Sequence, residues 1–312
     1  NGKTVGIPRS LFFHELFPLW KAFFGELGFR VTISAPTSRK IIRQGVENVL
    51  EEPCLPIKVA FGHVLDLLES QPDYIFLPVQ STMEPLSPGF SNHWNCPITQ
   101  AIPYILNSSA VTENALNQSG DARTELLRPV MHPDRGREHL TKTFRRLARE
   151  IGISDRARTD AAIEAGFTAL DSFNDWLRER GREVLKMIGP EQPAVAIIGR
   201  TYTTCDPEMS LNLPDKLHDL GLLAVPLDML PLTETAGEVA RDHPNMYGKS
   251  GQKILSAARF IAEQPNLFAL YVTNFNCGPD SFIMKYFGQE MQSKPYLTLE
   301  LDEHSADAGI KT

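Results

Sequence analysis

The chain has 312 residues, of which 42% are hydrophobic and 22% are charged, a globular composition with room for two domains. The 31 basic and 38 acidic residues give a net charge of −7 without a basic stripe, so we expect no nucleic-acid partner. No apolar run approaches the roughly 20 residues that span a bilayer, and no signal peptide is evident, so we expect a cytoplasmic protein without membrane contact. The first residues, Asn1-Gly2-Lys3, lack Met, and we expect both ends to be cut from a longer chain.

Strands and helices alternate over the first third of the sequence. Short apolar runs predict strands, and apolar residues at helical spacing predict helices. The expected strands are Thr4–Ile7, Phe29–Ser34 and Tyr74–Val79. The expected helices are Leu11–Leu27, Ser38–Leu50, Ile57–Glu69 and a short one from Cys96-Pro97 to Leu106.

The pattern changes after Asn107, where strand signals fade and charge rises. A long amphipathic helix is expected over Asp155–Ile188. Alternation then resumes with strands at Val195–Ile198, Leu222–Pro226, Leu267–Thr273 and Tyr296–Glu300. The helices expected between these strands are Met209–Leu220, Gly251–Glu263 and Asp280–Gln292.

The first and last thirds of the chain repeat the same order of sequence features, and this repeat predicts the fold. Gly6-Ile7-Pro8-Arg9-Ser10 parallels Ile198-Gly199-Arg200-Thr201, and Asp73–Val79 parallels Asn266–Val272. We therefore expect an α/β protein of two Rossmann-like half-domains, at 1–106 and 191–312, with parallel sheets facing a central cleft. Residues 107–190 are expected to form a helical insertion between them. Open α/β sheets bind ligands at the carboxyl ends of their strands, so the cleft is the expected site.

Each of the four cysteines stands close before a proline. The segments are Cys54-Leu55-Pro56, Cys96-Pro97, Cys205-Asp206-Pro207 and Cys277-Gly278-Pro279. Proline suits the first turn of a helix, so all four thiols are expected just before helix N-termini, where the helix dipole favours a thiolate. Soft thiolates select zinc or iron–sulfur clusters, and widely separated single ligands suit a cluster better than zinc. Four unrelated buried thiols remain the alternative.

Cationic side chains complete the expected site. Arg9 and Arg200 hold equivalent places after the first strand of each half, and both are expected to point towards an anionic cluster or an acidic substrate. Pairing with local carboxylates is the open alternative. His93, three residues before Cys96, is either a ligand or, as we favour, a loop histidine with a structural hydrogen bond. No P-loop, GxGxxG or HExxH motif occurs.

Several segments together resemble one known family. They are Val5-Gly6-Ile7-Pro8-Arg9, Glu52-Pro53-Cys54-Leu55-Pro56-Ile57-Lys58, Asp73-Tyr74-Ile75-Phe76-Leu77-Pro78, Asn276-Cys277-Gly278-Pro279-Asp280-Ser281-Phe282 and the run from Leu299 to Gly309 that contains Asp302-Glu303-His304. The chain resembles the family associated with CoA-enzyme activases, which is related to the 2-hydroxyacyl-CoA dehydratases and benzoyl-CoA reductases.

The resemblance implies a [4Fe–4S] cluster held by three cysteines, which carry over to Cys54, Cys96 and Cys277. Relatives are expected to lack a cysteine at Cys205, so the resemblance gives it no ligand role, and a supporting role beside the cluster is favoured over a fourth ligand. The implied partner is an ATP-dependent activase, in trans or fused in a longer chain. A small acidic or CoA-linked substrate is a further implied partner.

The leading interpretation is an electron-accepting or relaying iron–sulfur component of such an activase system in an anaerobe. An open iron site that binds substrate would make it a reductase or dehydratase component. Two alternatives stay open. One is a non-catalytic cluster-binding module of a longer activase polypeptide, and the other is a cofactor-free two-lobed solute-binding protein.

Overall fold

A computed structural model describes residues 2–49, 52–109, 112 and 124–305. The chain divides into two compact units. The first unit holds residues 1–84 and 95–173, and the second holds residues 85–94 and 174–312. The division after Phe173 falls inside a helix of 30 residues, α7 (Arg156–Leu185).

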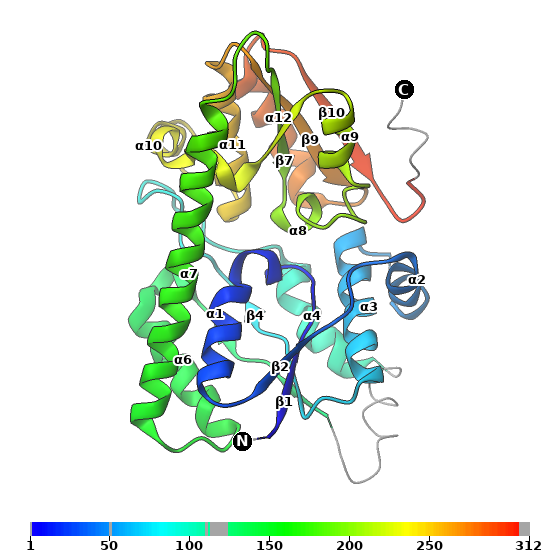
Figure 1. Ribbon diagram of the computed structural model, residues 1–312, viewed down its shortest axis with the longest axis vertical. Helices are drawn as coiled ribbons and strands as arrows, with labels where there is room; N and C mark the ends of the chain where they lie inside the picture. The colour runs from blue at the N-terminus through cyan, green and yellow to red at the C-terminus, as the bar shows by residue number, and fades with distance from the viewer. Residues whose placement is uncertain (1, 50–51, 110–111, 113–123, 306–312) are drawn as a thin grey trace. The chain divides into compact units, whose positions relative to one another are not determined.

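The first unit is built on a parallel sheet with strand order β2-β1-β3-β5. Figure 1 labels β1 and β2 of this sheet. Its strands are β1 (Thr4–Ile7), β2 (Arg30–Ile33), β3 (Tyr74–Phe76) and β5 (Glu125–Leu127). A two-stranded parallel ladder joins β4 (Val79–Gln80) to β6 (Val130–Met131). The helices are α1 (Phe13–Glu26), α2 (Arg39–Asn48), α3 (Leu55–Glu69), α4 (Pro97–Ser108), η1 (Pro133–Arg135), α6 (Gly136–Glu150) and the first part of α7.

The second unit is built on a parallel sheet with strand order β10-β9-β7-β8. Its strands are β7 (Ala194–Gly199), β8 (Leu223–Pro226), β9 (Leu267–Asn274) and β10 (Tyr296–Leu301). The helices are α8 (Thr201–Thr204), α9 (Leu213–Asp219), η2 (Leu227–Met229), α10 (Leu232–Asp242), α11 (Gly248–Ala262) and α12 (Gly278–Met291).

Both faces of the second sheet are covered. Two consecutive residues of β9 point to opposite faces of the sheet. Tyr271 packs into a core with α10, α11 and α12, whereas Val272 packs into a smaller core with α9. Burial on both faces is typical of parallel α/β sheets. The expected α/β class with parallel, Rossmann-like sheets is confirmed.

The two sheets share one topology. In each, the first strand lies between the second and the third, as the orders β2-β1-β3-β5 and β8-β7-β9-β10 show. The chain therefore leaves β1 towards β2 but leaves β3 towards β5, and it diverges in the same way from β7 and β9. Such a divergence opens a crevice at the carboxyl ends of the two central strands, the usual ligand position in open α/β sheets.

The structure differs from the sequence expectations at several places. Strands β5 and β6 lie within 107–190, where strand signals fade, because both are very short and β5 is an edge strand. The sequence analysis predicts no helix at α10, although its buried Leu232, Ala236 and Val239 follow helical spacing. Helix α9 begins at Leu213 instead of Met209, because Leu211 and Asn212 both have positive φ angles, 53° and 52°.

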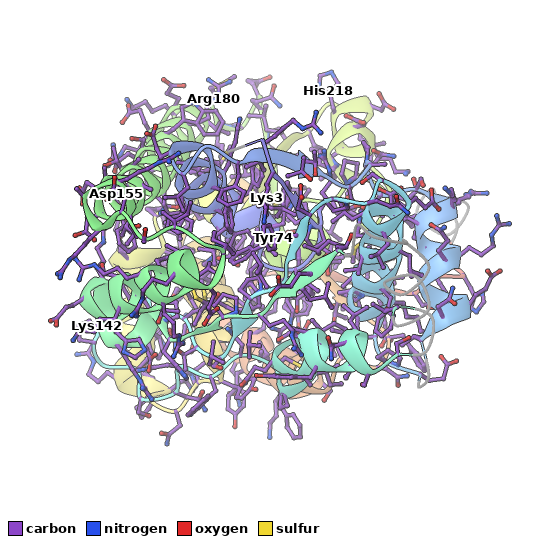
Figure 2. The ribbon with its side chains drawn as sticks, turned by 90° about the horizontal axis from the view of Figure 1, so that it is seen from below. Lys3, Tyr74, Lys142, Asp155, Arg180 and His218 are labelled. Carbon is purple, nitrogen blue, oxygen red and sulfur yellow. The ribbon has the colours of Figure 1, made fainter. Side chains whose placement is uncertain are left out.

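Aromatic side chains fill the core of the first unit. The Trp20 ring meets the Phe76 ring edge-on at 5.3 Å, and Phe24 meets Phe76 in the same way at 5.1 Å. At the amino-terminal edge of the sheet, Lys3 and Tyr74 lie close together (Figure 2), and Lys3 Nζ donates to Tyr74 Oη at 2.9 Å.

No helix in the described part of the chain is long and apolar enough to cross a membrane.

Candidate functional site

Three of the four cysteines stand at helix N-termini. Cys54, Cys96 and Cys277 are the N-cap residues of α3, α4 and α12, each with proline at the first or second helical position. Each of these helices leads into the next strand of its own parallel sheet, so its N-terminus lies at the carboxyl edge of that sheet. All three thiols are partly exposed there, where the helix dipole favours negative charge.

Cys205 does not follow this pattern, which corrects the expectation that all four thiols precede helices. It is exposed and is the C-terminal cap residue of α8, which has only 4 residues. The following Asp206 starts a turn instead of a helix, and its Oδ1 accepts the Met209 N–H at 3.0 Å. Cys205 therefore does not lie at the N-terminal, positive end of a helix, where the other three thiols lie.

An ion pair closes the crevice between β7 and β9. Arg200, directly after β7, donates from Nε at 3.0 Å and from Nη2 at 2.8 Å to Oδ1 of Asp280, in the first turn of α12. The other oxygen of Asp280 accepts the Thr273 hydroxyl at 2.9 Å. Arg200 and Asp280 are 7% and 2% exposed, so both charges are desolvated and depend on each other.

The Arg200 guanidinium also lies against Cys277. Burial raises the pKa of the Cys277 thiol to about 11, although the nearby Arg200 charge acts to lower it. Burial acts to lower the pKa of Arg200, but the charges of Asp280, Tyr202 and Cys277 and the hydrogen bond to Asp280 together outweigh it. The pKa of Arg200 is therefore raised, and the guanidinium stays charged. Asp280 therefore holds the Arg200 guanidinium beside the sulfur of Cys277. The sequence left open whether Arg200 points towards a ligand or pairs with a local carboxylate, and here it pairs with a carboxylate while lying next to a candidate ligand.

A second buried ion pair lies beside the first. Asp228, in η2 after β8, accepts the Thr201 hydroxyl at 2.8 Å and pairs with Lys253 Nζ at 2.7 Å. Burial acts to raise the pKa of Asp228, but Lys253 and Thr201 outweigh it, so the carboxyl stays ionised. The segments that follow β7, β8 and β9 thus each contribute a charged residue, Arg200, Asp228 and Asp280, to the carboxyl edge of the second sheet.

The start of α3 in the first unit carries a buried cation. Lys58, one turn after Cys54, is 3% exposed, and its Nζ pairs with Glu52 at 2.8 Å. Two glycines hold α3 against α2, since a Cβ atom on Gly45 would lie 1.8 Å from the Lys58 carbonyl oxygen. A Cβ atom on Gly62 would lie 2.0 Å from the carbonyl oxygen of Ile41. The two backbones meet directly, and this contact sets the position of the helix that Cys54 begins.

Arg9 follows β1, and its guanidinium lies 5.6 Å from the centroid of the Phe13 ring and in no ion pair of the described residues. Its backbone N–H donates to Ser34 Oγ at 2.8 Å, and its buried Nε has no hydrogen-bond partner in the described part of the chain. Ser34 Oγ lies 2.9 Å from Nδ1 of His63, and Thr37 Oγ1 lies 3.0 Å from Nε2 of the same ring. Every polar atom of the fully buried His63 ring is thus satisfied, so its role is to hold the loops after β1 and β2.

His93, the histidine considered as a ligand, lies on a loop of the second unit. Its Nε2 is 3.0 Å from the carbonyl oxygen of Phe90, a local hydrogen bond across three residues. Among residues 2–49, 52–109, 112 and 124–305, no group of three or more His, Cys, Asp or Glu side chains is placed to hold a metal ion.

Sequence reasoning missed the partners of the site's cations. Asp280 lies in the segment Asn276–Phe282, and an acidic residue three positions after Cys277 is a signal for a first-turn carboxylate, but its pairing with Arg200 is not predicted from the sequence. No local pattern in the sequence predicts the pairing of Asp228 with Lys253, because the two residues are 25 positions apart and lie on different helices, η2 and α11. Part of the Leu299–Gly309 segment, residues 306–309, lies outside the described residues.

Two parallel sheets, each with cysteine-bearing helix starts at its carboxyl edge, define a protein of Rossmann-like α/β units. Residues 4–230 match the model of the family described as CoA enzyme activase uncharacterised domain (DUF2229), and the chain belongs to this family. Cys54, Cys96 and Cys205 lie within the matched residues, and Cys277 lies beyond them. No curated protein matches the sequence.

Solved structures with some likeness to the chain include a crystal structure of ZnuA, with 13% identity, a TM-score of 0.30, and coverage of 98% of this chain and 93% of that one. Another is the SBP FpvC in complex with Ni²⁺ from P. aeruginosa, with 12% identity, a TM-score of 0.27, and coverage of 97% and 87%. At these scores neither likeness bears on the fold or on a ligand of this chain.

Proposed function

We propose that the chain binds one [4Fe–4S] cluster through Cys54, Cys96 and Cys277 and acts as an electron acceptor or relay for an ATP-dependent activase. The observation that carries the proposal is the shared placement of these three thiols, each as the N-cap of a helix at the carboxyl edge of a sheet. Membership of a family named for CoA-enzyme activases supports the same assignment.

The donor set fits such a group in its chemistry. Thiolates are the ordinary ligands of iron–sulfur clusters, and the three thiols are not engaged in disulfides. A bound cluster would supply reversible storage of single electrons at low potential. Because burial raises the pKa of Cys277 to about 11, this thiol is protonated at neutral pH and would have to release its proton on metal binding.

Charged residues of the chain support the ligands. A cluster with thiolate ligands is anionic, and uncompensated negative charge is costly to bury. Arg200 is held by Asp280 beside Cys277, and its remaining N–H groups are available to hydrogen-bond a sulfur atom. In the first unit, Lys58 on α3 supplies a buried cation one turn after Cys54.

The partner follows from the family and from the motifs of the chain. An activase that hydrolyses ATP, in trans or fused in a longer chain, would deliver the electron, because the sequence has no P-loop of its own. The electron would pass to a small acidic or CoA-linked substrate, here or on a further component. A role in reduction or dehydration would require that substrate to reach an open iron.

Anaerobic purification and reconstitution with iron and sulfide test the proposal. We expect broad visible absorbance that bleaches on reduction, and electron uptake from a partner activase only in the presence of ATP. Protein that stays colourless after reconstitution would contradict the proposal and favour a cofactor-free solute-binding protein. A coloured protein that no activase reduces would favour a non-catalytic cluster-binding module.

A further inference from the structure

Strand β10 forms one edge of the second sheet. The strand order β10-β9-β7-β8 places no strand of the described residues against its outer side. The strand is 6 residues long and contains neither proline nor lysine. Proteins usually blunt such edges with prolines, lysines or very short strands, because free N–H and C=O groups recruit further strands. An edge of this length and composition therefore suits pairing with another strand.

The other edges of the two four-stranded sheets are blunted in these ways. β8 has 4 residues and ends with Pro226, and β2 has 4 residues and begins with Arg30. β5 has only 3 residues. The outer side of β10 thus differs from the other sheet edges in the described part of the chain.

Three alternate residues direct their backbone groups outwards from β10. The Leu301 carbonyl oxygen accepts the Phe275 N–H at 3.0 Å, so Leu301 directs its backbone groups towards β9. Because these groups alternate along a strand, Tyr296, Thr298 and Glu300 direct theirs away from β9. The side chains of these three residues are exposed as well. The edge therefore offers regularly spaced donors and acceptors to a neighbouring strand.

Apolar side chains reach the same edge. Leu299 packs at the margin of the smaller core beside α9. Leu297 lies on the same face two residues earlier and is 60% exposed. Phe268 of β9 also belongs to this face and is 37% exposed. A strand added beside β10 would cover Leu297 and remove apolar surface from water.

The sequence of β10 complements itself in one antiparallel register, which indicates a second copy of the chain as the partner. With a two-fold axis through Thr298, this residue faces its own equivalent. Leu297 then lies opposite Leu299 of the second copy, and Tyr296 lies opposite Glu300. All outward backbone groups of the strand gain a partner, leucines meet on one face, and no like charges stand opposite each other.

The neighbouring symmetric registers lose hydrogen bonds. An axis at Leu299 would need the Asp302 N–H, which already donates to Ser305 Oγ at 2.9 Å. An axis at Leu297 would need the Lys294 N–H, which already donates to a carbonyl oxygen at the end of α12 at 3.0 Å. Only the axis at Thr298 uses donors that the strand directs outwards.

We propose that two copies of the chain form a two-fold symmetric dimer in which their β10 strands pair antiparallel about Thr298. The two four-stranded sheets then join into one continuous sheet. Two-fold dimers are the commonest symmetric assemblies of soluble proteins. A contact of one strand on each side is small, so the dissociation constant should be on the order of micromolar. The dimer does not depend on the cluster and can be tested on the full chain without iron.

Sedimentation velocity of the full chain over roughly 1–300 μM measures the association. We expect the mean mass to rise from one chain towards two. Thr298→Lys and Thr298→Glu each place like charges face to face at the axis, so each should weaken the dimer about fivefold. An equimolar mixture of the two variants should recover the dimer, because lysine then faces glutamate. Thr233→Lys, on the exposed side of α10, is the matched control and should associate like the wild type.

The Thr298 side chain is exposed, so both variants should keep the denaturation midpoint of the wild type at low concentration. A wild-type chain that stays monomeric at about 300 μM would overturn the proposal. So would a dimer that neither Thr298 variant weakens, because it would use another surface. Two weakened variants whose mixture stays equally weak would refute the axis at Thr298.

Discussion

Arg200 donates two hydrogen bonds to one oxygen of Asp280: its Nε and Nη2 atoms lie 3.0 and 2.8 Å from Asp280 Oδ1. The pair joins the loop after β7 to the first turn of α12 and is buried. It thereby ties the helix that Cys277 begins to the neighbouring strand of the sheet.

Asp280→Ala should lower the unfolding free energy by about 3–5 kcal/mol, because it leaves the Arg200 guanidinium buried without a partner. Chemical denaturation of the metal-free chain measures this loss. The double variant Arg200→Met/Asp280→Leu removes both charges and should be closer to the wild type than Asp280→Ala is. If Asp280→Ala is as stable as the wild type, the pair does not hold α12.

Gly62→Ala should destabilise the first unit by about 1–3 kcal/mol or more, since its Cβ atom would lie 2.0 Å from the Ile41 carbonyl oxygen. Gly25→Ala in α1 is the control, because a Cβ atom there meets nothing within 4 Å. That change should be neutral or stabilise by about 0.5–1 kcal/mol. Equal effects of the two substitutions on denaturation midpoints would contradict the close contact of α2 and α3.

His63 should make the free energy of unfolding depend on pH below about 6.5, the ordinary pKa of a histidine side chain. Burial, with the nearby Arg9 and His14, lowers the pKa of this ring from 6.5 to about 3. A lowered pKa means that the unfolded chain binds the proton first, so the contribution is fully present above pH 6.5 and is lost as pH falls below it.

The expected slope from this one group is roughly 1.4 kcal/mol per pH unit between about pH 6 and pH 4. Denaturation curves of the wild type and of His63→Gln at pH 7.5 and at lower pH measure it, since glutamine keeps one donor and one acceptor but does not titrate. Parallel pH profiles of the two proteins would show that the ring is not held neutral.

Arg9→Met should lower the reduction potential of the proposed cluster by on the order of tens of millivolts, because a nearby positive charge favours the more negative reduced state. Arg9 suits this test because it forms no ion pair with a carboxylate in the described part of the chain. Arg43→Met, on the exposed face of α2, should leave the potential unchanged. An unchanged potential in Arg9→Met would place this guanidinium outside the reach of the cluster.

Local patterns predict the elements well where one residue type decides the structure. Proline after Cys54, Cys96 and Cys277 correctly marks the start of a helix, because its ring and its missing N–H suit the first turn. The same pattern fails at Cys205, where Asp206 and two residues with positive φ hold a turn before the helix can begin.

Long-range relationships are what the sequence does not reveal. Arg200 and Asp280 are 80 positions apart, and nothing in either segment specifies the other. Thr99 stands three residues after Cys96, whereas the second unit has Asp280 three residues after Cys277, and this difference becomes visible only when the two sheets are compared. The convergence of Cys54, Cys96 and Cys277 to within roughly 6–7 Å, expected of cubane ligands, remains a prediction.

Iron and sulfide content of single Cys→Ser variants, after anaerobic reconstitution, tests the central claim most directly. The wild type should hold about four irons and four sulfides per chain. Ser at Cys54, Cys96 or Cys277 should each lower that content or make the cluster labile, whereas Cys205→Ser should retain the iron and shift only the redox behaviour. Full iron content in any of the first three variants, or none in the wild type, would contradict the assignment.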